Sequence, residues 1–168
     1  MSTVTELLED WSIYVIMSLR GANPGFHWGL FVPTNKPQGY VWHATNVGGG
    51  WTMEEKITSG IPNSMSLCLA FKVGTVNSSN WDTLRSTLHQ VPAEGQPSPN
   101  TGEDFSCRTW VEDSLLALHN ASIIQLSKAI QTIEEDVLRV AESNRRPVES
   151  GTGAAMIWNQ TGFTTTST

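Results

Sequence analysis

Three residues of this chain have the types that thiol chemistry requires, namely Cys107, His27 and His43. A cysteine attacks a carbonyl carbon only as its thiolate, and a nearby imidazole accepts the proton that the thiol gives up. That imidazole in turn needs a third group that holds its tautomer and its orientation. We therefore predict a thiol site in which Cys107 is the nucleophile, His27 the base and His43 the orienting group.

Cys107 stands where a helix is expected to begin. Ser106 before it is a good N-cap residue, and apolar residues follow at helical spacing as far as Leu118. The free backbone N–H groups and the positive dipole end of a helix N-terminus stabilise a thiolate, and they also stabilise the oxyanion of acyl transfer. The alternative interpretation of Cys107 is an ordinary buried cysteine.

The two histidines lie in neighbouring β-prone runs. His27 is near the start of residues 26–32, His43 is near the end of residues 40–44, and residues 33–39 between them carry turn signals. The two runs are expected to pair as an antiparallel hairpin, in which residues of both strands lie side by side on one face. We predict that His27 and His43 meet there; the alternative is that each is a histidine of the core.

The other expected elements complete one sheet and its helical cover. The glycine-rich residues 46–50 lack the lysine and hydroxyl residues of a phosphate loop, and we interpret them as a plain loop. Residues 92–102 are expected to form a long proline- and glycine-rich loop near the site. The remaining predicted elements are a helical turn within residues 2–10, strands over 11–20, 51–57 and 64–74, and a helix from about residue 80 to 91.

A second helix is predicted over residues 122–144, where apolar residues recur with alternating spacings of three and four. We expect it to cover the sheet or the helix of Cys107, and the alternative is a dimerisation helix that forms a homodimer. Residues 1–147 are predicted to form a single domain that includes this helix, followed by a polar, partly disordered tail over 148–168. The apolar residues of the pattern are Ile123, Leu126, Ile130, Ile133, Val137 and Val140.

Composition argues against several classes of function. The 168 residues are 39% hydrophobic and 15% charged, which is typical of one globular domain. A formal net charge of −6 and a lack of Lys/Arg clusters beyond Arg145-Arg146 argue against nucleic acid as a partner. We expect no membrane span and a cytoplasmic protein, since no apolar run is long enough and the first residues lack a secretory pattern. Cys68 and Cys107 lack metal-type spacing, so we expect no metal and no disulfide.

Three short segments, taken in order, resemble the lecithin–retinol acyltransferase-like group of circularly permuted, NlpC-related papain-like thiol enzymes. The order His, His, Cys is the permuted order of that group. The resemblance implies an α+β fold with a central antiparallel sheet and the nucleophile-bearing helix packed on it. It also implies Cys107 as nucleophile, His27 as general base and acid, and His43 as orienting residue. The segments are Phe26-His27-Trp28-Gly29-Leu30-Phe31-Val32, Gly39-Tyr40-Val41-Trp42-His43 and Ser106-Cys107-Arg108-Thr109-Trp110-Val111.

The predicted function is that of a cysteine-dependent acyl hydrolase or acyltransferase. It would act on an amide, ester or thioester through an acyl-enzyme, with a small-molecule or peptide substrate and no cofactor. We predict that Trp28, Trp42, Arg108 and Trp110 line the substrate pocket; the alternative for the tryptophans is ordinary core packing. The alternative is a non-catalytic module on the same fold that binds a small molecule or a protein. This alternative is favoured by the residues around Cys107, which differ from the Asn-Cys-Glu-His usual in the resembled group.

Overall fold

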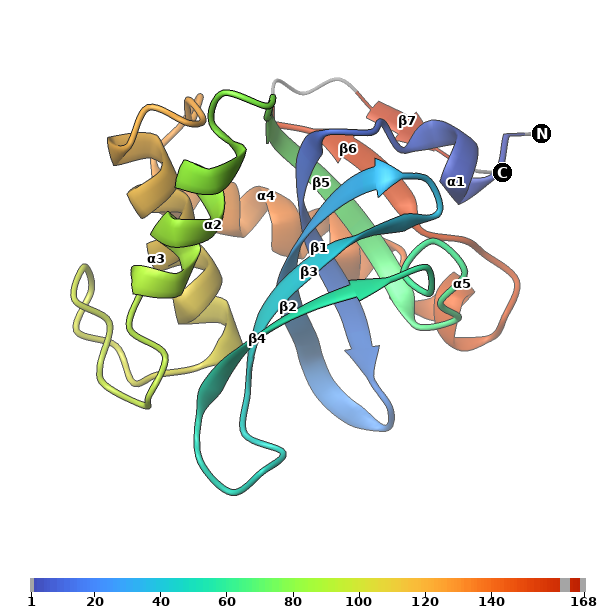
Figure 1. The fold of residues 1–168 in the computed structure, drawn as a ribbon. Helices are drawn as coiled ribbons and strands as arrows, with labels where there is room; N and C mark the ends of the chain where they lie inside the picture. The colour runs from blue at the N-terminus through green and yellow to red at the C-terminus, as the bar shows by residue number, and fades with distance from the viewer. Residues whose placement is uncertain (1, 161–163, 167–168) are drawn as a thin grey trace.

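The chain forms an α+β fold in which helices flank a seven-stranded sheet (Figure 1). The structure is a computed structural model and describes residues 2–160 and 164–166. The strands are β1 (Ser12–Arg20), β2 (Asn23–Asn35), β3 (Gln38–Thr45), β4 (Thr52–Thr58), β5 (Leu67–Thr75), β6 (Met156–Asn159) and β7 (Thr164–Thr166). The helices are α1 (Val4–Leu7), α2 (Trp81–Gln90), α3 (Cys107–Asn120), α4 (Ile130–Ser143) and α5 (Arg145–Glu149).

The sheet has the strand order β4-β3-β2-β1-β5-β6-β7 and is mixed. Its strand pairs are antiparallel except for β5 and β6, which run parallel. The expectation of an antiparallel sheet is therefore correct for β1 to β5 and wrong at β6. The parallel pair arises because the chain passes through α2 to α5 between β5 and β6, and a crossover of that length can return a strand in the same direction.

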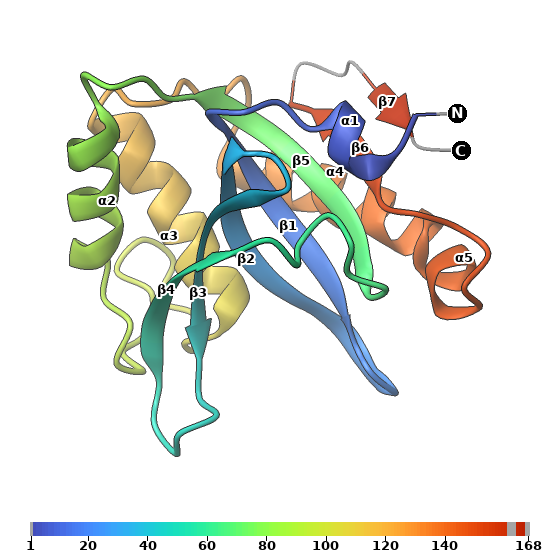
Figure 2. The same ribbon diagram turned by 45° about the vertical axis from the view of Figure 1, so that its right-hand side comes forward.

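Two hydrophobic cores cover the two faces of the sheet. Trp28, Leu30 and Trp42 belong to the core that α2, α3 and α4 close, whereas Phe31 and Val41 belong to the core beside α1. Figure 2 shows α2 and α3 side by side on one side of the sheet. This division follows from the pleat, which sends successive side chains of a strand to opposite faces.

The β2–β3 hairpin is longer than the sequence predicts. Residues 33–39 were expected to form a loop, but β2 and β3 extend until Asn35 pairs with Gln38. Pro33 has no N–H, yet its carbonyl oxygen accepts a bond of 2.7 Å from the backbone N–H of Trp11, which keeps this segment in the sheet. At Gly39 an added Cβ would lie 2.5 Å from the carbonyl oxygen of Val32, so only glycine fits this close approach.

The helix predicted over residues 122–144 is shorter in the structure, because α4 begins only at Ile130. Ser122 has a φ of 60°, which ends α3 and turns the chain away from a helical path. Ile123 and Ile124 are then buried in irregular backbone, and Gly74 makes room for Ile124. Ile123 and Leu126 match a helical spacing, but this segment is not helical, and its neighbour Ile124 packs against Gly74.

The apolar face of α4 packs inside the chain. Ile130, Ile133, Val137 and Val140 are all buried in the core that α4 shares with β5, so the interpretation as a covering helix is confirmed. The same burial removes these four side chains from the surface on which a dimerisation helix depends.

The predicted polar tail contributes to the sheet within the described residues. Residues 145–149 form α5, and residues 156–159 form β6, which pairs with β5. Residues 164–166 form β7, whereas the other residues of the expected disordered end, 163, 167 and 168, lie outside the described residues.

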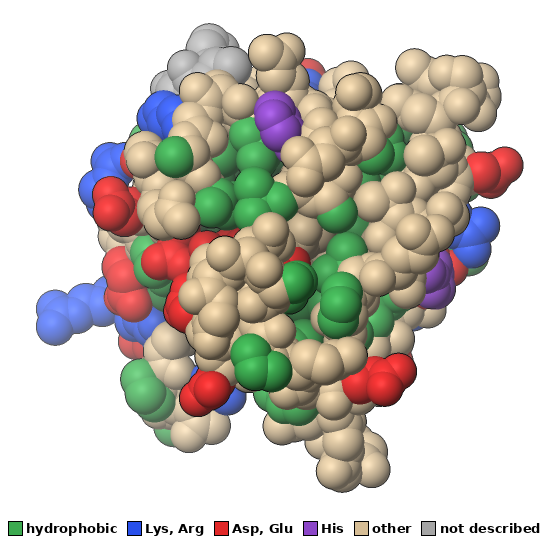
Figure 3. Space-filling model, turned by 90° about the vertical axis from the view of Figure 1, so that its left-hand side faces the viewer, with side chains coloured by type: hydrophobic (Ala, Val, Ile, Leu, Met, Phe, Trp, Pro, Cys, Tyr) green, Lys and Arg blue, Asp and Glu red, His purple; other side chains and the backbone are tan. Residues whose placement is uncertain are grey.

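The surface over α2 and α3 is mixed in character. Figure 3 shows hydrophobic side chains between polar ones on this face, with acidic and basic side chains next to each other along one margin. In the described part of the chain, no helix has the length and apolar character needed to cross a membrane.

Candidate functional site

His27 and His43 meet on one face of the β2–β3 hairpin, as the sequence predicts. His27 Nε2 lies 2.8 Å from His43 Nδ1, and the two rings are perpendicular with centroids 4.9 Å apart. Gly29 follows His27 by two residues on β2 and faces β3, and a Cβ added there would lie 3.4 Å from the Cβ of His43. The small residue at this position leaves room for the rings to approach each other.

A third polar residue, Glu54, completes this arrangement. The pairing of β3 with β4 places Glu54 directly opposite His43, and Glu54 Oε1 lies 2.7 Å from His43 Nε2. The side chain of His43 is 16% exposed and that of Glu54 is 47% exposed, so the chain of bonds runs from solvent into the protein. Glu54 was not predicted as a site residue, and its only signal was its position in a strand expected next to that of His43.

These two hydrogen bonds define which ring nitrogen of His27 is basic. The carboxylate of Glu54 accepts, so His43 Nε2 carries the proton, and in a neutral His43 the Nδ1 atom is then an acceptor. His27 Nε2 must donate to that acceptor. The remaining nitrogen of His27, Nδ1, is left with a free lone pair and can act as a base.

The electrostatic surroundings keep His27 neutral. Burial lowers the pKa of His27 to about 4, and the positive charges of Arg20 and Lys56, together with that of His43 whenever it is protonated, act in the same direction. The hydrogen bond from His43 lowers the pKa of Glu54 below its ordinary value, so this carboxyl is ionised at neutral pH. Near neutral pH, His27 is therefore a neutral imidazole. Its orientation is fixed by the hydrogen bond to His43, which is bonded in turn to the ionised Glu54.

Cys107 occupies the first position of α3, as predicted. Ser106 Oγ accepts a bond of 3.1 Å from the N–H of Thr109, and Thr109 Oγ1 accepts one of 2.9 Å from the N–H of Ser106. This capping box fixes the start of the helix and with it the position of the thiol. The partly buried thiol therefore lies at the positive end of a helix of 14 residues.

The thiol and the histidines approach the same cavity from different sides of the sheet. His27 and His43 share the pleat phase of Phe31 and Val41, which face away from α3. Cys107 reaches the end of β2 from the helix side, where its Sγ lies 4.0 Å from the carbonyl oxygen of Phe26. In the described residues no hydrogen bond joins Sγ to His27, so proton transfer needs a further approach of the two side chains.

A cavity of about 410 Å³ contains all three predicted catalytic residues. Trp51 forms one wall and is held by an edge-to-face contact with Phe105, with ring centroids 4.9 Å apart. Asn46 and Val47 also line it, so the glycine-rich segment that we interpreted as a plain loop borders the site. The complete lining is Arg20, His27, His43, Ala44, Thr45, Asn46, Val47, Trp51, Ser106 and Cys107.

The three tryptophans predicted to line the pocket lie elsewhere. Trp28, Trp42 and Trp110 are at most 4% exposed and belong to the core between the sheet and the helices. Trp42 Nε1 donates a bond of 2.5 Å to Glu55, whose pKa is lowered to about 2, mainly by its hydrogen bond from Arg85. This hydrogen bond fastens β3 to β4 on the face opposite to the histidines.

Arg108, the fourth residue predicted for the pocket, forms ion pairs instead of lining the cavity. Its guanidinium contacts the carboxyl groups of Glu103, Glu112 and Glu134 at 2.5, 2.8 and 2.5 Å. The pairs connect α3 with α4 and with the segment before α3. Arg108 therefore fixes the N-terminal end of α3, the helix that begins with Cys107.

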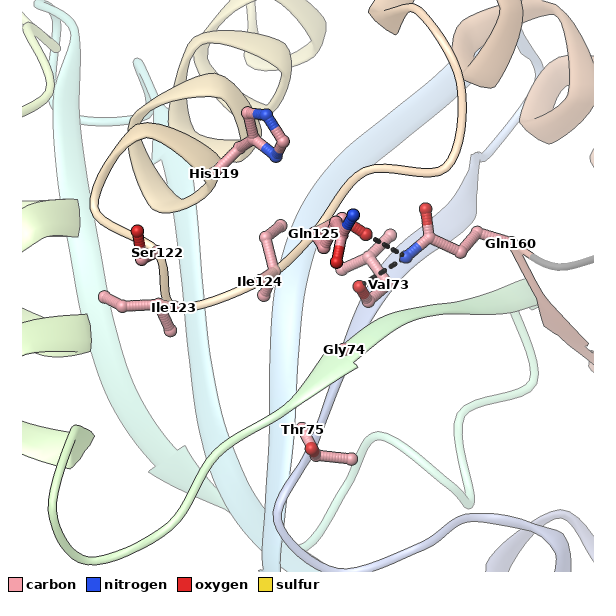
Figure 4. A pocket seen from close by; sticks show the side chains of 9 residues that line it. All are labelled: Val73, Gly74, Thr75, His119, Ser122, Ile123, Ile124, Gln125 and Gln160. Atoms are coloured by element: carbon pink, nitrogen blue, oxygen red, sulfur yellow. Dashed lines mark hydrogen bonds between the residues drawn. The ribbon is translucent and has the colours of Figure 1, made fainter.

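The second cysteine, Cys68, and the cavity at the end of β5 offer less chemistry. Cys68 is buried, and burial raises the pKa of its thiol to about 11, so it stays protonated near neutral pH. A cavity of about 570 Å³ lies at the end of β5 (Figure 4) and contains one histidine, His119, but no cysteine or carboxylate among its described lining residues. Gln160 crosses it with bonds of 2.7 Å to the carbonyl of Val73 and 3.0 Å to that of Gln125.

The fold and the site together define an α+β protein in which two hydrogen-bonded histidines, backed by Glu54, share one cavity with a cysteine in the first turn of a helix. The chain belongs to DUF6540, described as a family of unknown function, whose profile matches residues 13–125. The match includes β1 to α3 and all the site residues, and it excludes α4 and β6. No curated protein and no solved structure matches the chain. In the described part of the chain, no group of three His, Cys, Asp or Glu side chains is arranged to hold a metal ion.

Proposed function

We propose that this protein is a cysteine-dependent acyl hydrolase or acyltransferase. The observation that carries the proposal is the hydrogen-bonded chain from Glu54 through His43 to His27, which ends in the cavity that also contains Cys107. A carboxylate, two imidazoles and a thiol in this order form a base whose tautomer is held by its partners. The permuted papain-like arrangement implied by the sequence resemblance forms part of the same proposal.

The proposed reaction begins with proton transfer to the base. As Sγ of Cys107 moves toward His27, Nδ1 takes the thiol proton and the sulfur forms a bond to the carbonyl carbon of the substrate. The carbonyl electron pair moves onto oxygen, where the backbone N–H of Cys107 at the start of α3 stabilises it. His27 then gives its proton to the leaving alcohol, amine or thiol as that bond breaks, which leaves an acyl-cysteine.

The second half of the reaction regenerates the thiol. Water, or an acceptor alcohol or amine, loses a proton to His27 Nδ1 and attacks the acyl-cysteine carbonyl. The carbon–sulfur bond breaks, and the sulfur recovers the proton from His27. Water gives hydrolysis, and another acceptor gives transfer. No metal or cofactor takes part in either half.

The first experiment measures acyl-enzyme formation with p-nitrophenyl acetate. We expect a burst of nitrophenol and an acetyl group on Cys107 by peptide mass spectrometry, both lost in Cys107→Ser. In His27→Gln, the rate of acetylation should fall by roughly a hundredfold, the size of a typical general-base contribution. His119→Gln is the control, because His119 is exposed and lines a different cavity.

Two results would contradict the proposal. One is an acetylation rate at Cys107 that is the same in wild type and His27→Gln. The other is acetylation at Cys107 no faster than that of a small free thiol at the same pH. Circular dichroism of each variant separates loss of the base from loss of the fold.

The second candidate function is a binding module on the same fold that does not use its thiol. The observation that favours it is the position of Sγ, which approaches the carbonyl of Phe26 and forms no hydrogen bond with His27 in the described structure. Such a module would leave Cys107 unacylated, whereas a ligand in the cavity would still shift the imidazole signals of His27 and His43 in NMR spectra. The burst experiment therefore distinguishes the two functions.

A further inference from the structure

Arg20 differs from four other arginines of the chain, which are bound to carboxylates. Arg85, Arg108, Arg139 and Arg145 each form an ion pair with a carboxylate. Arg20 is exposed at the wall of the cavity that contains Cys107, and no carboxylate within residues 2–160 and 164–166 forms an ion pair with it. In a chain with a formal net charge of −6, an arginine without an acidic partner beside a nucleophile leaves a positive charge available to a ligand.

The local backbone accounts for the position of Arg20. β1 pairs with β2 so that Ser18 lies opposite His27, and Arg20 follows two residues later at the end of the strand. The register shifts between Leu19 and Arg20, and a bulge of this kind changes the direction in which the next side chain points. The hairpin thus brings a guanidinium to the same end of the sheet as the two histidines.

Among the described residues that line the cavity, Arg20 supplies a full positive charge and no residue supplies a negative one. The cavity lining includes Arg20 and two histidines but no Asp or Glu among the described residues, and the N-terminus of α3 adds the positive end of a helix dipole. The carboxylate of Glu54 stands behind His43 and is hydrogen-bonded to it. The charge of Arg20 already acts at His27, where it helps to lower the pKa of that imidazole.

We propose that the substrate carries a carboxylate close to the acyl group that Cys107 attacks, and that Arg20 binds this carboxylate. The proposal rests on the proposed function and adds its substrate class. A guanidinium binds a carboxylate with two parallel hydrogen bonds, which orients the substrate as well as attracting it. A volume of about 410 Å³ is at the lower end of the range for small-molecule sites, and a short acid such as a dicarboxylic half-ester or half-amide suits it.

The test compares two thiol reagents that differ in charge. Iodoacetate and iodoacetamide both form a carbon–sulfur bond with Cys107 and release iodide, while the thiol proton leaves to a base. The ratio of the two rates, divided by the same ratio for a small free thiol, measures the preference of the site for an anion. We expect a preference for iodoacetate of roughly tenfold at low salt, from one unit charge a few ångströms away, and a smaller preference at high salt.

Matched variants assign the preference to Arg20. We expect the ratio to fall to that of the free thiol in Arg20→Gln and to remain in Arg20→Lys. Arg146→Gln, an exposed arginine of α5 outside the cavity lining, should keep the wild-type ratio. An unchanged ratio in Arg20→Gln would overturn the proposal, even if both reagents still modify Cys107 in a manner that depends on His27.

A second measurement does not depend on the reactivity of the thiol. The Nε–H signal of Arg20 in NMR spectra should shift when succinate is added and stay in place when succinamide is added. A shift with succinate together with an unacylated Cys107 would support the anion site while refuting the acyl chemistry. Equal or absent shifts with the two compounds would refute the anion site alone.

Discussion

The buried carboxyl of Glu112 makes the stability of this protein depend on pH in a way that one substitution should remove. The side chain of Glu112 on α3 is 9% exposed and lies beside Glu134 of α4, with Arg108 bound to both. Burial, followed by the hydrogen bond to Glu134 and the charge of Glu134, raises the pKa of Glu112 to about 8, although Arg108 acts in the opposite direction. Glu112 therefore holds a proton at neutral pH when the chain is folded.

The direction of the effect follows from proton counting. Between about pH 4.5 and 8 the folded chain binds a proton at Glu112 that the unfolded chain releases, so the free energy of unfolding falls as the pH rises through this window. One full proton corresponds to about 1.4 kcal/mol per pH unit. Since Glu134 and Arg108 are 27% and 28% exposed and solvent screens their charges, we expect a slope of about 1 kcal/mol per pH unit.

Urea denaturation of wild type and Glu112→Gln at several pH values between about 5 and 7.5 tests this reasoning. An amide cannot ionise, so the variant should lose the slope of about 1 kcal/mol per pH unit, and its stability relative to wild type should increase steadily with pH. Glu135→Gln on the exposed side of α4 is the matched control and should run parallel to wild type. A difference between wild type and Glu112→Gln that does not change with pH would refute the assignment of the proton to Glu112.

Three further predictions concern the site and its support. Glu54→Gln should lower the rate of Cys107 acetylation by roughly tenfold. The amide cannot supply the negative charge that fixes the tautomers of the two histidines. Nitrogen NMR of the imidazoles should therefore show a mixture of tautomers in the variant and one tautomer in wild type. The rate of acetylation should fall as the pH drops to about 4, where His27 gains a proton and ceases to be a base, and a stopped-flow pH profile checks this. Gly74→Ala should destabilise the fold by about 2 kcal/mol in urea denaturation, since its Cβ would lie 2.7 Å from Cγ2 of Ile124, whereas Gly48→Ala, with nothing within 4 Å, should be close to neutral.

Much of the candidate site was accessible from the sequence because it depends on local structure. A hairpin of two β-prone runs brings His27 and His43 together whatever the rest of the chain does. A serine before a helical pattern places Cys107 at a helix N-terminus in the same local way. The meeting of the cysteine with the hairpin in one cavity is a tertiary feature, which the sequence indicated through the residue types that thiol chemistry requires and through its resemblance to permuted thiol enzymes.

The residues that the sequence did not reveal are those that depend on pairing between strands. Glu54 reaches His43 because β4 pairs with β3 in one particular register, and a shift by one residue would place Glu55 there instead. Arg20 reaches the cavity because of a bulge in the β1–β2 pair, and no residue type in β1 predicts this bulge. Neither register nor bulge can be read from residue types along a single strand.

Apolar patterns also left two assignments undecided. Trp28, Trp42 and Trp110 are equally suited to a pocket wall and to a core, and only the packing of α2, α3 and α4 against one face of the sheet places them in the core. The spacing of Ile123 and Leu126 is compatible with a helix, but the contact of Ile124 with Gly74 keeps this segment irregular. In both cases, the conformation or burial of the residue depends on a contact with a segment far away in the sequence.

The sequence by itself determined the elements whose hydrogen bonds and caps are local: the hairpin of the two histidines, the capped helix of Cys107, and the amphipathic α4. Only the tertiary structure decided which face of the sheet each element covers, the parallel return of β6, and the chain of contacts from Glu54 to His27. The physical reason is that a turn or a cap is satisfied by neighbouring residues, whereas strand register and burial are settled by the sum of contacts across the whole core.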